Sequence, residues 1–359
     1  MVRAAVLAAP GAELTVDDVT MPDPGPGQVR IRVTAAGVCH SDLSLASGML
    51  RQQTPAVLGH EAAGTVVAVG DGVTAVAVGQ PVVLNWAPAC RRCWFCEHGA
   101  PNLCEHAADA AGQPYGSLAD GRPVYPGLGA GAFAEETVVP AGSAVPLPPD
   151  VPVEEAALLG CAVLTGVGAV RNHARVAAGE SAVVLGLGGV GLCVVQGLRM
   201  AGAAPIIAVD TSPAKETLAR RMGATDYLTA GAELSRSVRA LTGGRGADQA
   251  FDCVGSSGTI RQAWSITRRG GRATVIGIGS REDAVTFNAL ELFHFARTLS
   301  GCVYGDADPD RDIPLLIEDV RAGRLDLAGL VTDQVPLDGI PAAFAAMREG
   351  RGGRTLVRP

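Results

Sequence analysis

Four cysteines, spaced C-x2-C-x2-C-x7-C, constrain this chain more than any other feature: Cys90, Cys93, Cys96 and Cys104. Thiolates this close in sequence can all turn toward one ion, and four cysteines are a typical ligand set for structural zinc. A pair of disulfides and an iron–sulfur cluster are the alternatives. Four sulfur donors leave no position for a substrate, so the pattern predicts a structural zinc site. His98 and His106 lie near enough to compete as ligands, but we expect them to be solvated neighbours.

Length and charge narrow the class of protein. With 359 residues, 48% of them hydrophobic, the chain is expected to form two domains, since one domain usually takes about 100–200 residues. The net charge of −7 argues against nucleic acid and anionic membranes as partners. The N-terminal segment Met1–Pro10 lacks the pattern of a signal peptide, so we expect reduced cysteines and a cytoplasmic protein. The uncharged stretch Ala182–Leu198 contains glycines and Gln196, which favour a buried strand and helix over a membrane span.

The first part of the chain, to about Leu147, consists of short alternating segments separated by glycine and proline. This pattern is typical of a small β-barrel domain. The predicted strands are Arg3–Ala8, Gln28–Ala35, Glu61–Val69, Pro81–Leu84 and Phe133–Val139.

From Ser181 to Val303 apolar strands alternate with helical stretches. Parallel strands need crossover connections, so this order predicts a doubly wound parallel sheet, the Rossmann arrangement of α/β proteins. The tail from Tyr304 returns to mixed helix and strand. The six predicted strands are Ser181–Leu185, Pro205–Asp210, Asp226–Leu228, Asp248–Cys253, Arg272–Gly277 and Thr298–Val303.

The first turn of that sheet carries a G-x-G-x-x-G pattern between a strand and a helix. Glycines there let the backbone turn tightly and approach a pyrophosphate at the helix N-terminus. Asp210 ends the next strand, where a carboxylate accepts hydrogen bonds from an adenosine ribose. Lys215, the only lysine, either reaches the same ribose or is a surface residue. A glycine-rich turn without a ligand is the alternative reading. The predicted loop residues are Gly186, Gly188, Gly189, Val190 and Gly191.

Three further residues are far apart in sequence: Cys39, His60 and Cys161. Two thiolates and one imidazole leave zinc a fourth position open for water or substrate. Singly, each residue is uninformative, because an isolated cysteine is usually a small core residue. We expect that role for Cys193, Cys253 and Cys302.

Taken in order, these motifs resemble the zinc-dependent alcohol dehydrogenases of the medium-chain dehydrogenase/reductase family. The resemblance covers nearly the whole length, and the segments that carry it, besides the cysteine quartet, are Gly37–Asp42, Gly59–Gly64, Gly160–Ala162, Gly186–Gly191, Asp210 and Lys215. It implies a β-rich GroES-like catalytic domain made of residues 1–162 and 304–359, with an NAD-binding Rossmann domain at 163–303.

The resemblance also implies roles for single residues. Cys39, His60 and Cys161 match the catalytic zinc ligands, Glu61 a carboxylate that exchanges onto the metal, and Asp42 the partner that orients His60. Ser41 takes the alcohol proton, unless it is only a turn or capping serine. The remaining matches are His40 and Arg354 with the coenzyme pyrophosphate, and Trp86 and Leu128 with the substrate pocket, where either is alternatively plain core.

Two departures from the family pattern bear on the substrate. Ser44 stands where many relatives have a relay histidine. Leu50 and the segment His106–Pro114 lack the acid and the arginine that glutathione-dependent formaldehyde dehydrogenases use. We therefore expect NAD-dependent oxidation of primary alcohols with an apolar or aromatic group, or the reverse reduction of aldehydes.

Other readings of function and assembly remain open. One alternative is oxidation of a formaldehyde adduct of another low-molecular-weight thiol, and another is a non-catalytic NAD(H)-binding redox sensor. We expect a homo-oligomer, with a dimer favoured and a tetramer possible, because the segment Glu105–Ala132 is long, as in dimeric members.

Overall fold

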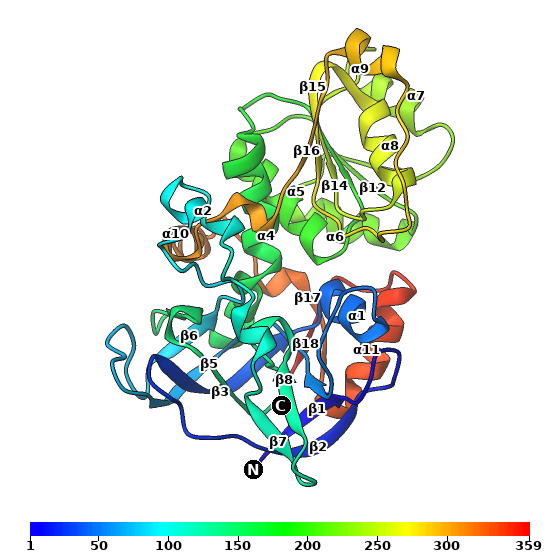
Figure 1. The fold of residues 1–359 in the computed structure, drawn as a ribbon. Coiled ribbons are helices and arrows are strands. Elements are labelled where there is room, and N and C mark those ends of the chain that lie inside the picture. The colour runs from blue at the N-terminus through cyan, green and yellow to red at the C-terminus, as the bar shows by residue number, and fades with distance from the viewer. The chain divides into compact units, whose positions relative to one another are not determined.

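The computed structural model describes all residues, Met1–Pro359, and divides into two compact units. Residues Met1–Ala162 and Asp308–Pro359 form the first, which we call the β-rich unit. Residues Val163–Ala307 form the second, the parallel-sheet unit. Figure 1 shows the elements of each.

The β-rich unit contains a closed barrel and a larger sheet. The barrel has the order β1-β2-β7-β8-β4, and the sheet the order β10-β6-β5-β3-β18-β17, with β9 also paired to β3. The C-terminal strand β18 joins the sheet beside Gly37, opposite β5, which also pairs with β3. The bounds are β1 Val2–Leu7, β2 Thr15–Thr20, β3 Gln28–Gly37, β4 Ala56–Val57, β5 Glu61–Val69, β6 Pro81–Leu84, β7 Gly116–Leu118, β8 Pro123–Pro126, β9 Glu136–Pro140, β10 Ala144–Pro146, β17 Val331–Val335 and β18 Arg354–Val357.

One predicted strand begins later than its pattern indicates. Phe133 was expected to start a strand, but β9 starts at Glu136. The backbone N–H of Phe133 instead donates to the carbonyl of Leu58, and its carbonyl accepts from Ala5. Phe133 is fully buried in the core of this unit, so its hydrophobicity reflects packing and not membership of β9.

The parallel-sheet unit confirms the predicted doubly wound arrangement. Its six strands are all parallel, in the order β13-β12-β11-β14-β15-β16. Strand β15 begins at Thr267, earlier than the predicted Arg272, and its pairing with β14 contains a register shift. The bounds are β11 Ala182–Leu185, β12 Ile206–Asp210, β13 Asp226–Thr229, β14 Ala247–Asp252, β15 Thr267–Val275 and β16 Thr298–Gly301.

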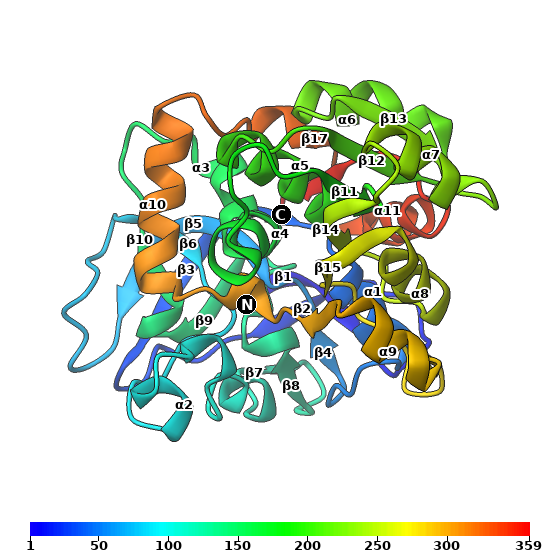
Figure 2. The ribbon, with the colours of Figure 1, turned by 90° about the horizontal axis from the view of Figure 1, so that it is seen from above.

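Helices cover both faces of this sheet. Helix α5 packs against β11, β12 and α6, whereas α8 packs against β14, β15 and α7. Figure 2 shows the strands running between these two layers. The helices of the chain are α1 His40–Ser47, α2 Trp94–Glu97, α3 Val153–Ala156, α4 Ala162–Gly168, α5 Gly189–Ala201, α6 Glu216–Met222, α7 Leu234–Leu241, α8 Ser257–Ile266, α9 Ala289–Phe295, α10 Pro309–Arg321 and α11 Ile340–Arg348.

No single helix has the length and hydropathy needed to cross a bilayer. One bent pair of helices, Val153–Gly160 with Ala162–Ala174, is long and apolar enough by length and composition only.

Candidate metal and coenzyme sites

The cysteine quartet forms one cluster around α2. All four sulfurs lie within 4.8 Å of one another, and the Sγ atom of Cys93 is 3.5 Å from that of Cys96 and 3.9 Å from that of Cys104. Ligand sulfurs about 2.3 Å from one tetrahedral zinc are about 3.8 Å apart, whereas bonded disulfide sulfurs are about 2 Å apart. All nine cysteines of the chain are free. The quartet therefore fits one zinc ion, and the disulfide alternative is wrong.

Backbone N–H groups surround these sulfurs. Cys93 donates its backbone N–H to the sulfur of Cys90, and Cys90 donates to that of Cys104, at 3.3 and 3.2 Å. Backbone N–H groups of Cys96 and Glu105 lower the pKa of Cys93 to about 6. Such donors favour thiolate over thiol, which is the form that binds metal.

The two nearby histidines have other partners. The Nδ1 atom of His98 lies 2.7 Å from the carbonyl of Trp94, and its ring stacks on the indole. The Nδ1 atom of His106 lies 2.9 Å from the Asp109 carboxylate. Neither belongs to the ligand group that the four sulfurs form.

A second cluster gathers Cys39, His60 and Cys161 inside the β-rich unit. Cys39 precedes α1, His60 precedes β5, and Cys161 precedes α4. Their ligand atoms lie within 4.8 Å of one another, with His60 Nε2 3.3 Å from the Cys161 sulfur. All three are buried, with exposed fractions of 5, 1 and 6%. Two sulfurs and one imidazole nitrogen at this separation fit a zinc ion with one position open.

Asp42 fixes the geometry of this cluster. One of its carboxylate oxygens accepts from the backbone N–H of Cys39 at 3.2 Å. The other lies 2.9 Å from His60 Nδ1 and accepts from the backbone N–H of Gly59 at 3.0 Å. The imidazole therefore presents Nε2 to the sulfurs, the arrangement that an outer carboxylate imposes on a metal-binding histidine. Gly59 has φ of +88°, and a Cβ there would lie 2.6 Å from the backbone nitrogen of Phe133.

Glu61 and Arg354 form a buried ion pair beside the cluster. Arg354 donates to one oxygen of Glu61 at 2.6 Å and to the carbonyl of Val38 at 2.8 Å. The second oxygen of Glu61, Oε1, is buried and accepts no hydrogen bond. It lies against Gly37, where a Cβ would come within 2.4 Å of it. An unpartnered buried carboxylate oxygen next to thiols and an imidazole is a further observation that fits a cation here.

Burial and charge shift the pKa values of this cluster. A hydrogen bond between the two thiols lowers the pKa of Cys39 and raises that of Cys161, so Cys39 is the more readily ionised. Burial works against a charged His60, but the charges of Asp42 and Cys39 raise its pKa. Burial raises the pKa of Glu61 to about 7, although Arg354 opposes the shift.

Helix α1 carries the predicted proton acceptor Ser41, the predicted coenzyme contact His40, and Ser44, which stands in place of a relay histidine. The hydroxyl of Ser41 lies 3.8 Å from the Cys39 sulfur. His40 begins the helix and is exposed, whereas Ser44 is buried one turn later. The structure therefore brings Ser41 to the ligand cluster and leaves Ser44 within the packed face of the helix.

Of the two predicted pocket residues, only Trp86 has a described contact with a zinc ligand. Its ring lies edge-on to the His60 imidazole, with centroids 6.3 Å apart. Leu128 is partly buried against the barrel core, as is Leu50.

In the glycine loop of the parallel-sheet unit, Gly186, Gly188 and Gly191 each have a different structural role. Gly186 has φ of +86°, and a Cβ at Gly191 would lie 1.9 Å from the Gly186 carbonyl oxygen. A Cβ at Gly188 would meet no atom within 4 Å. Gly186 is therefore needed for the turn, and Gly191 for the close packing of the loop. Gly188 leaves open space at the start of α5, whose first turn contains Gly189 and Val190. An open cradle at a helix N-terminus fits a pyrophosphate.

Asp210 supports this loop directly. Its carboxylate accepts from the backbone N–H of Leu187 at 2.8 Å and from that of Ser212 at 3.0 Å. Lys215 is buried, which lowers its pKa against the attraction of Asp210. It is therefore not the solvated surface lysine of the alternative reading.

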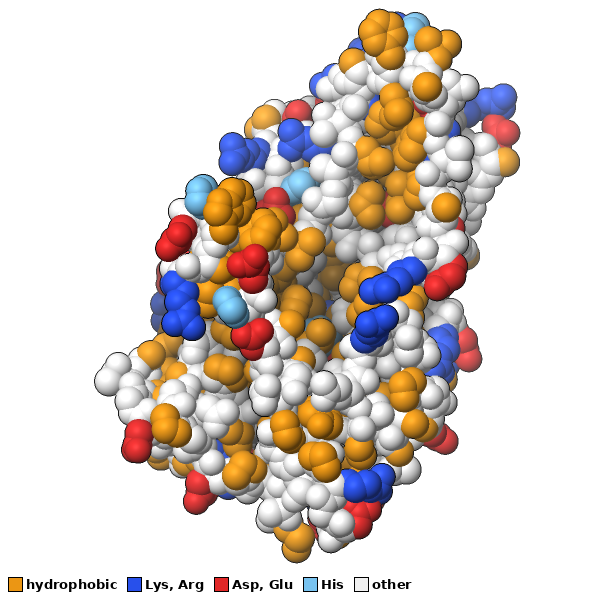
Figure 3. Space-filling model, viewed as in Figure 1, with side chains coloured by type: hydrophobic (Ala, Val, Ile, Leu, Met, Phe, Trp, Pro, Cys, Tyr) orange, Lys and Arg blue, Asp and Glu red, His pale blue; other side chains and the backbone are white.

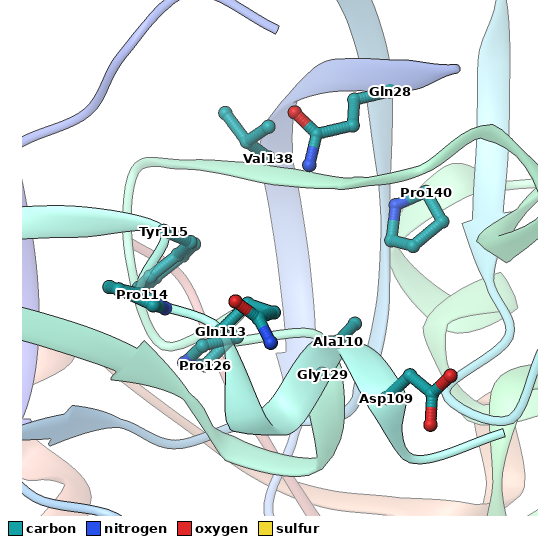
Figure 4. A pocket seen from close by; sticks show the side chains of 10 residues that line it. All are labelled: Gln28, Asp109, Ala110, Gln113, Pro114, Tyr115, Pro126, Gly129, Val138 and Pro140. Carbon is teal, nitrogen blue, oxygen red and sulfur yellow. The ribbon is translucent and has the colours of Figure 1, made fainter. Parts of the chain in front are cut away.

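One cavity in the β-rich unit lies apart from these clusters. It measures about 350 Å³ and lies beneath Gln28 and Pro140, over the segment that follows the quartet. Figure 4 shows Gln28 and Val138 on one side and Asp109 and Gln113 on the other. No predicted site residue lines it.

Sequence reasoning missed Gly37 and Gly59 as supports of the metal cluster, and it did not connect Glu61 with Arg354. The only signal for the glycines was their place beside the motifs. The pairing of Glu61 with Arg354 has no sequence signal, because the residues are 293 positions apart.

Comparisons with known proteins agree along the whole chain. Residues 25–149 match the family model described as alcohol dehydrogenase GroES-like domain, and residues 189–320 match the one described as zinc-binding dehydrogenase. A curated S-(hydroxymethyl)glutathione dehydrogenase of Escherichia coli is 38% identical over 367 residues, covering 99% of each chain.

Solved structures agree as well. The chain is 33% identical, with a TM-score of 0.93, to an alcohol dehydrogenase zinc-binding domain protein from Burkholderia ambifaria, covering 99% of this chain and 98% of that one. It is 28% identical, with a TM-score of 0.91, to benzyl alcohol dehydrogenase from Acinetobacter calcoaceticus, covering 99% of each. Since sequence and fold both match over nearly its full length, the chain belongs to the zinc-dependent alcohol dehydrogenases of the medium-chain dehydrogenase/reductase family.

Proposed function

We propose that this enzyme oxidises primary alcohols carrying an apolar or aromatic group, with NAD as hydride acceptor, or reduces the corresponding aldehydes. The observation that carries the proposal is the buried donor set of Cys39, His60 and Cys161, with the Ser41 hydroxyl beside it. Zinc held by such donors supplies a Lewis acid that lowers the pKa of an alcohol, while NAD takes the hydride.

Ser41 takes the alcohol proton in this proposal. Its hydroxyl both accepts and donates a hydrogen bond, and it lies 3.8 Å from the Cys39 sulfur. Ser41→Ala should lower kcat by about 10²–10⁴-fold with little change in NAD affinity, because a positioned proton-transfer group contributes that much. Ser44→Ala is the matched control and should cost far less. Equal losses would mean that Ser44 also carries the proton.

Trp86 supports the preference for apolar alcohols. Its indole lies edge-on to the His60 ring, so an aromatic side chain lies next to the ligand cluster. The similarity to a benzyl alcohol dehydrogenase points the same way. A panel of alcohols with NAD should give a higher kcat/KM for benzyl alcohol than for ethanol, and Trp86→Ala should narrow that ratio. A preference for ethanol would contradict this assignment.

A second candidate is oxidation of a formaldehyde adduct of a low-molecular-weight thiol. Relatives 38% identical to this chain are named S-(hydroxymethyl)glutathione dehydrogenase. Against it, Leu50 is apolar and packs on the barrel core, and His106–Pro114 contains no arginine. Formaldehyde oxidation assayed with and without glutathione or another small thiol decides between the two candidates. A requirement for the thiol favours the second candidate.

The third candidate was an NAD(H)-binding redox sensor without turnover. The intact ligand set of Cys39, His60 and Cys161 weighs against it.

Asp210 underlies the proposed preference for NAD. A 2′-phosphate of NADP beside this carboxylate is a like-charge contact that costs roughly 1–4 kcal/mol at about 4 Å. Lys215 is the nearby cation, but Asp210 already attracts it. Asp210→Gly should narrow the ratio of kcat/KM for NAD over NADP by about tenfold or more. Wild-type enzyme that used both coenzymes equally would contradict the assignment.

We also propose a homodimer, with a tetramer as the alternative. Strand β16 is an edge of the parallel sheet and is mostly exposed. Nearby α9 buries no residue and exposes 69% of Leu290 and 84% of Phe293. Figure 3 shows hydrophobic side chains gathered on the part of this unit that carries α8 and α9. Phe293→Glu should shift the mass measured by light scattering from dimer to monomer, whereas a wild-type monomer would contradict the proposal.

A cytoplasmic location is proposed from the state of the cysteines. All nine are free, which suits a reducing compartment. Fractionation of the source cells should recover the enzyme with cytoplasmic markers, and recovery outside the cytoplasm would overturn the proposal.

A further inference from the structure

A third group of metal-binding side chains lies in the parallel-sheet unit, whereas both zinc sites belong to the β-rich unit. His173 lies in the helical turn Ala169–Ala174, Cys302 follows β16, and Asp306 ends the turn Tyr304–Asp306. One ligand atom from each lies within 4.8 Å of the other two, the separation that also defines the two zinc clusters. His173 and Asp306 are 133 positions apart, so only the fold brings them together.

The sulfur of Cys302 is buried beside two backbone N–H groups and a carboxylate. It accepts hydrogen bonds from the backbone N–H groups of Gly305 and Asp306. The same kind of N–H···S bond surrounds the zinc quartet, where Cys90 and Cys104 are acceptors. On their own these bonds favour the thiolate form, but burial and the charge of Asp306 outweigh them and keep the sulfur protonated without a metal ion. A cysteine that only fills the core does not require them.

The chain folds back over this sulfur in an unusual conformation. Tyr304, Gly305 and Asp306 have φ values of +54°, +71° and +46°. Positive φ is uncommon for residues other than glycine, and two of these three are not glycine. The turn directs two N–H groups at the sulfur and sets the Asp306 carboxylate beside it, where the thiol and the carboxylate are hydrogen-bonded.

His173 completes the group. Its Nδ1 atom lies 2.6 Å from an Asp306 oxygen, and its Nε2 atom lies 2.8 Å from the hydroxyl of Ser300. The His173 side chain is 12% exposed and that of Asp306 38%, so the cluster is reached from solvent on the carboxylate side. Hydrogen bonds hold the donors together while burial raises the pKa of Cys302 to about 12. An incoming ion replaces these protons, as at other thiolate sites.

We propose that His173, Cys302 and Asp306 bind a third divalent transition-metal ion, of the zinc or cobalt class. One nitrogen, one sulfur and one oxygen donor are the ligand types that zinc takes in proteins. Magnesium and calcium take oxygen ligands, so a set containing sulfur and imidazole disfavours both. Water or the Ser300 hydroxyl completes a tetrahedron.

The ion would cross-link two segments of the parallel-sheet unit. It would join the turn before β11 to the segment after β16, two residues before the chain passes to the β-rich unit at Asp308. Metal binding of this kind adds directly to stability, because the unfolded chain lacks the site.

Metal counting on the whole enzyme tests the proposal. Enzyme incubated with a small excess of zinc and then desalted should retain three zinc ions per chain, against two for Cys302→Ser and for His173→Gln. His98→Gln is the matched control, because it removes a histidine that has no place in any ligand cluster, and it should retain three. Two ions in wild type, or three in Cys302→Ser, would overturn the proposal.

Cobalt distinguishes this site from adventitious surface binding. Co²⁺ added to enzyme whose two zinc sites are filled should give a thiolate-to-cobalt charge-transfer band in wild type and none in Cys302→Ser. Asp306→Asn preserves the shape of the side chain, so it guards against misfolding of the other variants. It should weaken cobalt binding by at least the roughly 10–100-fold that loss of even an outer metal partner costs. Equal cobalt spectra in all variants would mean that the ion binds elsewhere and would overturn the proposal.

Discussion

The two candidate zinc sites of the β-rich unit are built in opposite ways. The quartet takes all four donors from the segment Cys90–Cys104, and local N–H groups surround its sulfurs. The second site takes three donors from positions that span Cys39 to Cys161, held by Asp42 from yet another position. The first site is therefore formed by one short segment of the chain. The second site exists only when the sheet is assembled.

The ion pairs beside the two sites also differ, because one is exposed and the other is buried. Arg91, within the quartet segment, pairs with Asp308 and Asp310 at the start of α10, and its side chain is 43% exposed. Arg354 pairs with Glu61 in full burial beside the second site. Exposed pairs contribute little to stability, whereas removing one partner of a buried pair leaves an uncompensated charge.

Replacing Cys161 should break the second site without breaking the fold. Cys161→Ser removes one zinc ligand. The resulting fall in kcat should exceed the loss caused by removing a proton-transfer group, which is about 10²–10⁴-fold. Activity, zinc content and circular dichroism measured together test this. Normal turnover with one zinc ion lost would mean that the catalytic ion lies elsewhere.

Replacing Cys104 should give the converse result. Cys104→Ser removes a ligand from a site whose metal binding is coupled to folding, so the midpoint of thermal unfolding should fall and one zinc ion should be released. Activity measured on the protein that remains folded should fall far less than in Cys161→Ser. A single zinc ion that survives this change with full stability would refute the division into structural and catalytic sites.

Removing Arg354 tests the buried ion pair. Arg354→Ala should lower the free energy of unfolding of the β-rich unit by about 3–5 kcal/mol, because Glu61 is left buried without its cation. Urea denaturation measures this. The matched control is Arg354→Met combined with Glu61→Gln, which removes both charges and should recover part of the loss. An unchanged midpoint in Arg354→Ala would show that the pair is solvated.

Changing Asp42 to asparagine tests the support of His60. Asparagine keeps the size of the side chain but removes the charge that orients the imidazole. Zinc affinity or kcat should fall by about 10–100-fold. Competition with a chromogenic chelator gives the affinity. An unaltered zinc affinity and kcat would mean that Gly59 and the backbone orient the ring unaided.

The smallest effect is expected at Arg91. Arg91→Ala should cost less than about 1 kcal/mol, because its pairs are partly exposed, and the difference from wild type should shrink as salt is added. Thermal unfolding at low and high ionic strength measures both. A loss as large as that of Arg354→Ala would erase the contrast between the two regions.

The sequence predicted elements well where one periodicity dominates. The six strands of the parallel sheet were all identified, and most predicted ends differ from the observed ends by a few residues or fewer. The error is larger at the start of β15, where a register shift lengthens the strand. Seven strands were not assigned individually, because most are short and become strands only through pairing: β2, β4, β7, β8, β10 and the C-terminal β17 and β18. Phe133 misled the prediction because burial and strand membership give similar patterns.

By itself, the sequence determined the quartet, the glycine loop and the acid at the end of the next strand. Each depends on spacing along a few turns of chain, where covalent geometry limits what neighbouring side chains can do. Only the tertiary structure decided that Arg354 meets Glu61 and that His173 meets Cys302 and Asp306. Those contacts follow from the pairing of β18 with β3 and from the course of the chain after β16, and contacts between segments this far apart leave no local pattern to read.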